Sequence, residues 1–189
     1  MQGRAKGQSL VEMAFVAPIL LILLFGIIDM GYLMFAFATV SQAARDGAET
    51  ASQLPPFPDW LEYKDNPPSD AAFPGYAKDD CVFTILEAVK SNAVLFSDQA
   101  NDISRYVIIS YPEGNDTRNM QDRGPIEVRI DYPVRGLTPV FGLLGFNEGF
   151  TMSVVARRSL ENLGVSPSSP DGKACAENPQ DWQDKHPDL

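Results

Sequence analysis

The hydrophobic pattern divides the chain into a long apolar N-terminal segment and a longer polar part. Residues 13–28 are uncharged and almost wholly apolar, and the apolar run resumes after Asp29 as MGYLMFAFATV. A helix needs about 20 apolar residues to cross a bilayer, so the segment predicts a membrane-spanning helix. A secretory signal peptide, the alternative, would have a shorter apolar region that ends at a cleavage site. We therefore expect the segment to stay in the mature protein.

The helical periodicity continues beyond the length that a membrane requires. Small residues recur at three- and four-residue steps and predict a narrow face: Ala36, Val40, Ala43, Ala44, Gly47 and Ala51. We predict a transmembrane and assembly helix over residues 8–53. At 1.5 Å per residue, such a helix of about 45 residues would be about 65 Å long. Its outer half is expected to pack on a globular domain, on partner helices, or on both.

Two carboxylates and three helix-modifying residues mark the apolar segment as more than an anchor. Glu12 stands where the span begins, and a carboxylate in hydrocarbon is costly enough to indicate a function. Pro18 is expected to kink or loosen the helix, although it can equally have no role. Asp29 lies between Gly26 and Gly31, where a neighbouring helix could approach closely and donate a hydrogen bond. The alternative for Asp29 is a position in water at the outer edge of the bilayer.

The charges beside the span predict its orientation. Arg4 and Lys6 precede it without an accompanying acid, so the positive-inside rule keeps the N-terminus in the cytoplasm. Beyond the span, Arg45 is followed at once by acidic residues. We therefore predict a single pass through the inner (cytoplasmic) membrane, with the bulk of the chain extracytoplasmic.

The polar part predicts one α+β domain over residues 54–163. It begins with a proline-rich, semi-rigid connection over residues 54–76. An amphipathic helix is expected in DDCVFTILEAVKSNAVLF, with Asp79 or Asp80 as its cap. Its predicted apolar face consists of Val82, Phe83, Ile85, Leu86, Val89, Ala93 and Val94. The last part, residues 164–189, is rich in Pro, Ser and acids and predicts a mobile tail, pinned by Cys175 and Trp182.

Three further segments predict an antiparallel sheet with one dry face. They are residues 105–111, 125–134 and 149–161, which are rich in β-branched and aromatic residues and alternate with polar ones. The turn between the first two is polar and is expected to be exposed. The connection at 136–146, GLTPVFGLLGF, is apolar. We expect it to cover the end of the core, and a contact surface for a partner is the alternative.

Charge and composition exclude several classes of function. From Asp46 onward the chain holds 23 of its 25 acidic and 12 of its 15 basic residues, a balance that disfavours nucleic-acid binding. A single histidine, His186, excludes the usual hydrolase triads and makes a zinc site improbable. Acidic pairs such as Asp79 and Asp80 are more typical of solvated surface than of catalysis. We predict no cofactor and no enzymatic activity.

The chain contains two cysteines, Cys81 and Cys175. An extracytoplasmic location would allow them to form a disulfide, and two free thiols are the alternative.

The stretch GQSLVEMAFVAPILLILLFGIIDMGYLMFAFATVSQAARDGAE strongly resembles the N-terminal signature of TadE/TadG-like proteins, the pseudopilins of tight-adherence (Tad, type IVc) pili. A glycine followed five residues later by a glutamate and a long apolar helix is also similar to the wider type IV pilin pattern. FTMSVVARRSLEN resembles the last strand of such proteins. The resemblance implies a type IV pilin-like α+β fold.

The resemblance also implies a processing site. In that family a prepilin peptidase cuts after the glycine, here Gly7, which would remove a cytoplasmic leader of residues 1–7 and leave Gln8 as the new N-terminus. Glu12 would then occupy the fifth mature position. Pairing of the new amine with Glu12, within one chain or between neighbours, would lower the cost of both charges and help to set axial register.

The leading functional hypothesis is a minor pilin or pseudopilin of a Tad pilus, with roles in assembly or initiation, adhesion and biofilm formation. Its expected partners are other pilin subunits, the prepilin peptidase, the inner-membrane assembly platform and membrane lipid. Three alternatives stay open: a single-pass scaffold protein that retains its leader, a membrane-anchored envelope enzyme, and a major filament subunit.

Overall fold

The computed structural model describes most of the chain. The described residues are 4–62, 79–93, 103–119, 121–143, 145, 149–161, 175–176, 181 and 184. The expectations for most of the tail, for Trp182 and for the second part of the proline-rich connection lie outside them. The side chains of residues 4–9 are likewise outside the description.

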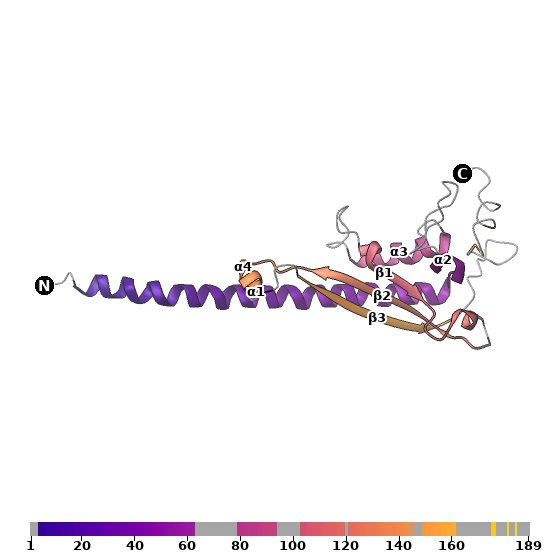
Figure 1. Ribbon diagram of the computed structural model, residues 1–189, viewed down its shortest axis with the longest axis horizontal. Helices are drawn as coiled ribbons and strands as arrows, with labels where there is room; N and C mark the ends of the chain where they lie inside the picture. Colours follow the sequence, from indigo (N-terminus) through magenta and orange to yellow (C-terminus); the bar gives the residue numbers. More distant parts are fainter. Residues whose placement is uncertain are drawn as a thin grey trace. The chain divides into compact units, whose positions relative to one another are not determined.

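A long helix, three short ones and three strands make up the described structure (Figure 1). The helices are α1 (Arg4–Gln53), α2 (Pro58–Glu62), α3 (Asp80–Asn92) and α4 (Pro139–Leu143), and two 3-10 turns cover Ile103–Tyr106 and Asn115–Thr117. The strands are β1 (Val107–Ser110), β2 (Pro125–Val134) and β3 (Phe150–Ser159). The predicted α+β, pilin-like fold class is confirmed.

The sheet has the strand order β1-β2-β3, and β1 runs antiparallel to β2. Val107 lies opposite Ile130, and Ser110 lies opposite Glu127. The predicted first strand was too long, because its first two residues belong to a 3-10 turn that buries Ile103. The ring of Tyr106 in that turn packs edge-on against Tyr132 of β2, with the centroids 5.4 Å apart.

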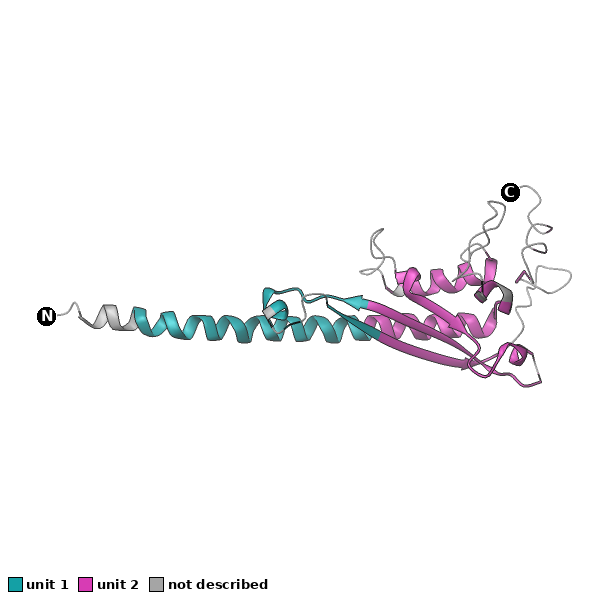
Figure 2. Cartoon of the chain, in the orientation of Figure 1, with its two compact units in different colours: residues 1–38, 133–152 teal, residues 39–132, 153–189 magenta. Residues whose placement is uncertain are grey.

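The chain separates into two compact units, which Figure 2 distinguishes by colour. Unit 1 consists of residues 1–38 and 133–152, and unit 2 of residues 39–132 and 153–189. The unit boundaries fall within α1, β2 and β3. The predicted boundaries between leader, helix, domain and tail stay predictions.

The core of unit 2 contains the small-residue face of α1. Val40, Ala43, Ala44 and Ala51 are completely buried. A Cβ atom added to Gly47 would lie 2.6 Å from a methyl group of Val89 in α3 and 3.3 Å from one of Val128 in β2. The outer half of α1 therefore packs on the domain, which confirms one of the two partners predicted for it.

Helix α3 is amphipathic, as predicted, with a completely buried row at Val82, Ile85 and Val89. Phe83 was assigned to the same face, and this was wrong: its side chain is 50% exposed. Each residue advances about 100° around a helix, which places Phe83 well to one side of that row. The helix also ends earlier than expected, at Asn92 with Ala93 as its cap.

The sheet has one dry face, and its buried side chains alternate with polar or exposed ones along β2 and β3. In β2 the alternating residues Ile126, Val128 and Ile130 are completely buried. In β3 the same face carries Met152, which is 9% exposed, whereas Val155 lies on the opposite face and is 48% exposed. The opposite face is polar, and there the Ser153 hydroxyl donates a hydrogen bond to Asp131 of β2. The predicted single dry face is therefore confirmed.

Candidate functional site

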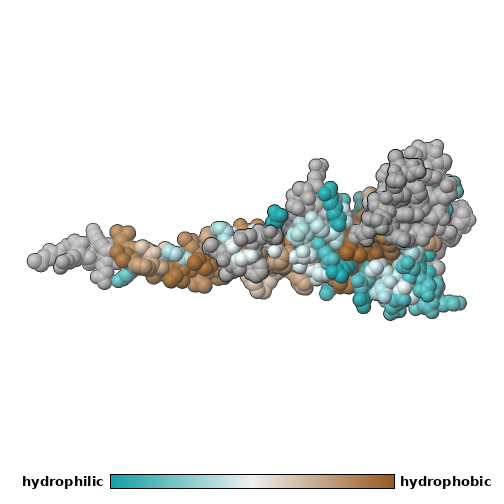
Figure 3. All heavy atoms as spheres, in the orientation of Figure 1, coloured by the Kyte–Doolittle hydropathy of each residue, from teal (hydrophilic) through white to brown (hydrophobic). Residues whose placement is uncertain are grey.

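The N-terminal half of α1 presents an apolar surface. Gly7 and Gln8 lie in its first turns, Glu12 follows about one turn later, and the helix continues through Pro18 without interruption. From Leu10 onward most large apolar side chains are at least 40% exposed, as the brown stretch in Figure 3 shows. In a soluble domain such a surface would be buried, so its exposure calls for lipid or a protein partner.

Among the described residues, α1 is the helix that is long and apolar enough to cross a membrane. The qualifying segment is Leu10–Gln53, and none of its most apolar stretch is buried within the chain. This is consistent with a single-pass membrane protein.

Gly26 and Gly31 leave the helix surface open. A Cβ atom added to either would have no neighbour within 4 Å. Both line a shallow apolar groove together with Ile22, Leu23, Ile27, Met30 and Met34. Among the described residues of unit 1, none fills this groove or lies within 4 Å of a Cβ atom added to either glycine.

Asp29 occupies neither of the two environments expected for it. Its side chain is 5% exposed, so it does not lie in water. The backbone amides of Leu137 and Thr138 each donate to Oδ1 at 3.0 Å, and the Thr138 hydroxyl donates to Oδ2. The donors therefore come from within unit 1, just before α4, and not from a neighbouring helix.

Leu137 and Thr138 were not predicted as the partners of Asp29. The dipeptide Thr138-Pro139 could have indicated them, because Thr is a common helix cap and Pro is favoured at the first helical position. Within α4, Val140 is 7% and Phe141 is 8% exposed. This burial agrees with the first of the two roles expected for residues 136–146, which was to cover the end of the core.

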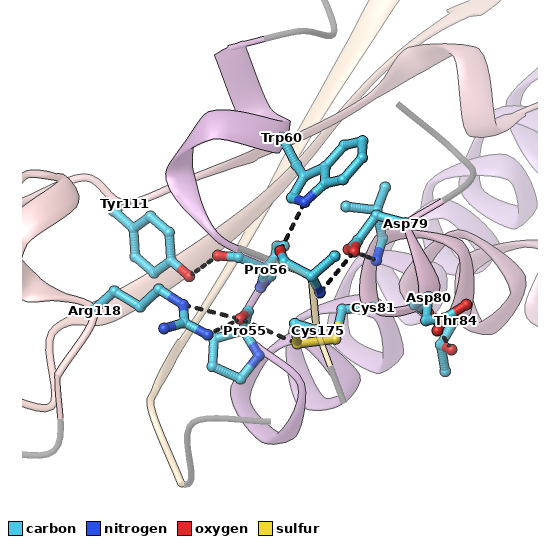
Figure 4. The surroundings of a disulfide bond; sticks show 12 residues. Pro55, Pro56, Trp60, Asp79, Asp80, Cys81, Thr84, Tyr111, Arg118 and Cys175 are labelled. Atoms are coloured by element: carbon cyan, nitrogen blue, oxygen red, sulfur yellow. Dashed lines mark hydrogen bonds between the residues drawn. A yellow bond between two sulfur atoms is a disulfide. The ribbon is translucent and has the colours of Figure 1, made fainter. Parts of the chain in front are cut away.

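A second cluster, in unit 2, surrounds a disulfide between Cys81 and Cys175 (Figure 4). The two Cα atoms are 5.3 Å apart and 94 residues apart in sequence. Next to the bond, Trp60 Nε1 donates to the Ala176 carbonyl at 2.7 Å, and the Ala176 amide donates to Asp79 at 3.2 Å. This arrangement holds residues 175–176 against the start of α3.

Asp79 is the cap of α3 that the sequence predicted. Its Oδ2 accepts a hydrogen bond from the Val82 amide at 3.1 Å. Burial raises the pKa of Asp79 to about 6, although the hydrogen bonds from Val82 and Ala176 oppose the change. Asp79 therefore has two structural roles: it caps α3 through Val82 and binds the backbone of Ala176. These roles explain why a carboxylate is buried at this position.

The prolines that follow α1 are held by the polar loop after β1. The Tyr111 hydroxyl donates to the Pro56 carbonyl at 2.7 Å. Arg118 donates to the Pro55 carbonyl through Nε at 3.1 Å and Nη2 at 2.9 Å, and its guanidinium lies 3.5 Å from the centre of the Phe57 ring. Part of this loop is therefore a packing element, although it was expected only to be exposed.

The described residues contain no group of three or more His, Cys, Asp or Glu side chains that could hold a metal ion. The features that stand out are instead an exposed apolar helix, a buried carboxylate within it and a cross-linked α+β domain. They are consistent with a class of protein: single-pass membrane proteins in which an N-terminal helix precedes a pilin-like domain.

Comparison with known families agrees with this class. Residues 7–49 match the family described as TadE-like protein, which confirms the resemblance seen in the sequence. The match associates the chain with the Tad pilus. No curated protein and no solved structure matches the chain.

Proposed function

We propose that the protein is a minor pilin, or pseudopilin, of a Tad-type (type IVc) pilus. In this role it contributes to pilus assembly or initiation, and thereby to adhesion and biofilm formation. The observation that carries the proposal is the TadE-like match, which begins at Gly7 and covers the exposed apolar helix. Such a surface can be covered by lipid before assembly and by the helices of other subunits afterwards.

The proposal assigns a sequence of events to the start of α1. Arg4 and Lys6 keep this end in the cytoplasm, where a prepilin peptidase cuts between Gly7 and Gln8. The new amine lies four residues from Glu12, which is about one helical turn. Pairing the two charges, within one chain or between neighbours, reduces their cost in an apolar bundle and favours one axial register. The inner-membrane assembly platform then moves the subunit into the growing pilus.

The mass of the protein isolated from its native cells tests the cleavage. We expect the wild-type chain to lack residues 1–7. A Gly7→Val variant should retain them, because a branched side chain replaces the small residue at the cut. Gly3→Val, a glycine substitution in the same leader, is the matched control and should be processed like the wild type. A wild-type chain that keeps its leader would support the single-pass scaffold protein instead.

Glu12 can be tested separately from cleavage. Glu12→Ala should leave membrane insertion intact and strongly reduce incorporation into sheared pili, measured by immunoblot of both fractions. Glu12→Gln keeps the side-chain volume but removes the charge, and should resemble Glu12→Ala if the charge pair sets the register. Normal incorporation of both variants would exclude this role. Mass spectrometry of the filaments that finds this chain as the dominant component would favour a major subunit.

A further inference from the structure

Asp29 lies inside the apolar band of α1 and not at its end. Exposed apolar side chains continue on both sides of it: Ile28 is 43%, Met30 is 54% and Phe37 is 55% exposed. At 1.5 Å per residue, the band from Leu10 to Phe37 is about 40 Å long. The hydrocarbon core of a bilayer is about 30 Å thick, and the headgroup regions extend it to about 40–45 Å. The band therefore matches the whole bilayer, and Asp29 falls within it, about 12 Å from the Phe37 end.

A carboxylate at this depth requires hydrogen-bond donors that travel with it. The donors are the amides of Leu137 and Thr138 and the Thr138 hydroxyl. The amides of residues 137–138 need Asp29 in turn, because non-helical backbone near lipid requires hydrogen-bond acceptors. Since hydrogen bonds fix the distance between the two groups, residues 137–138 must lie at the same depth in the bilayer as Asp29.

The surface of this segment suits such a position. Residues 136–143 contain no charged side chain, and Leu137 is 62% exposed. Val140 and Phe141 are buried within the unit, so they are not available to a partner. Arg135, at the start of the segment, is exposed and long enough to extend its charge toward headgroups. An exposed apolar side chain, Leu137, close to a cation, Arg135, is typical of a segment that lies in the membrane interface.

We propose that residues 135–143, held on α1 by Asp29, form a second membrane contact in the outer interfacial region of the bilayer. The partner is phospholipid, which Leu137 meets at the boundary between headgroups and acyl chains. Asp29 acts as a tether: its carboxylate accepts hydrogen bonds from two backbone amides of the segment and so holds the segment at the depth of Asp29 in the bilayer. The contact continues the lipid-facing surface of α1. It goes beyond the pilus role and requires only that α1 crosses a membrane.

Lipid-mediated quenching of fluorescence tests this contact in the full chain, reconstituted in phosphatidylcholine vesicles. Because Cys81 and Cys175 are paired in a disulfide, Leu137→Cys introduces a single free thiol. A maleimide fluorophore can label this thiol. Leu21→Cys, within the span, and Glu113→Cys, on an exposed polar turn, provide matched controls. With bromine placed on the acyl chains near the headgroups, the label at 137 should be quenched several-fold more than that at 113. Bromine near the chain ends should quench the label at 21 most.

Each contrary result overturns a defined part of the proposal. Equal quenching at 137 and 113 would mean that the segment does not contact lipid. Efficient cross-linking of Leu137→Cys between two copies, without quenching, would assign the surface to a neighbouring subunit. Absence of quenching at 21 would remove the membrane anchor itself. Adding Asp29→Ala to Leu137→Cys should reduce quenching to the level at 113, and unchanged quenching would exclude the tether. Leader cleavage plays no part in these measurements, so failure of the pilus role leaves them interpretable.

Discussion

Asp29 and Asp79 are both buried carboxylates, and each accepts hydrogen bonds from backbone amides beside a short helix. Asp29 reaches Leu137, 108 residues away, and Asp79 reaches Ala176, 97 residues away. A carboxylate that accepts several amide hydrogen bonds recovers much of the solvation that it loses on burial. Each aspartate therefore joins two distant segments of its own unit.

The raised pKa of Asp79 predicts a pH dependence of stability. Burial raises this pKa from 3.8 to about 6. Between these pH values the folded state holds a proton that the unfolded state has released, so stability falls as pH rises from about 4 to about 6. We expect a loss on the order of 2 kcal/mol over this window from Asp79. Urea unfolding of the full chain in detergent, followed by circular dichroism at pH 4 and pH 7, measures it.

Asp79→Asn should flatten this pH dependence, because asparagine retains the cap but does not titrate. Asp80→Asn, at the exposed neighbouring position, is the matched control and should keep most of it. An unchanged slope in Asp79→Asn would assign the pH dependence to other groups.

At the scale of elements, α1 carries glycines in two contrasting environments. Gly47 is enclosed by the side chains of α3 and β2, whereas Gly26 faces an open groove. The first glycine permits close packing within the domain. The second leaves space on a surface that lipid or another helix can cover. Helix α1 thus packs on its own domain around Gly47 and leaves an open surface around Gly26 for lipid or another helix.

Alanine substitutions should separate these two environments. Gly47→Ala forces a methyl group against Val89, whose branched side chain cannot move away cheaply. We expect a net destabilisation of about 1–2 kcal/mol, after a gain of about 1 kcal/mol in helix propensity. Gly26→Ala is the matched control and should not lower stability. Thermal unfolding of both variants in detergent provides the comparison, and equal melting temperatures would contradict the packing at Gly47.

At the scale of the whole molecule, the buried face of α1 makes the outer part of this helix inseparable from the domain. Residues 40–51 contribute Val40, Ala43, Ala44 and Ala51 to the core of unit 2. Removing them would expose the apolar sides of α3 and β2. The exposed apolar residues before Thr39, in contrast, contribute nothing to that core.

Two truncations test this division. A chain that begins at Thr39 should still unfold cooperatively in unit 2, because it keeps Val40, Ala43, Ala44 and Ala51, although residues 133–152 lose the part of α1 that belongs to their unit. A chain that begins at Leu54 should lose cooperative unfolding and aggregate, because the surface around Val89 and Val128 loses its cover. Size-exclusion chromatography and circular dichroism distinguish the two. Similar folding of both chains would show that the helix face is dispensable.

Much of the fold could be predicted because its signals are local. The membrane-length helix follows from hydropathy, the buried face of α1 from small residues at helical spacing, and β2 from its alternation. Asp79 was identifiable as a cap because it immediately precedes its helix. The stretch of residues 7–49 showed the resemblance to TadE/TadG-like proteins without any tertiary information. In each case the physical cause acts within one or two turns of helix or along one strand.

What required the tertiary structure was the identity of distant partners. No periodicity links Asp29 to Leu137 and Thr138, or Trp60 to Ala176, because these contacts join segments about 100 residues apart. The exposure of Phe83 also depended on what packs against each face of α3. Local patterns decide which elements form and which faces are apolar. Only the folded chain decides which apolar face meets which, and which donor reaches a carboxylate within the apolar helix.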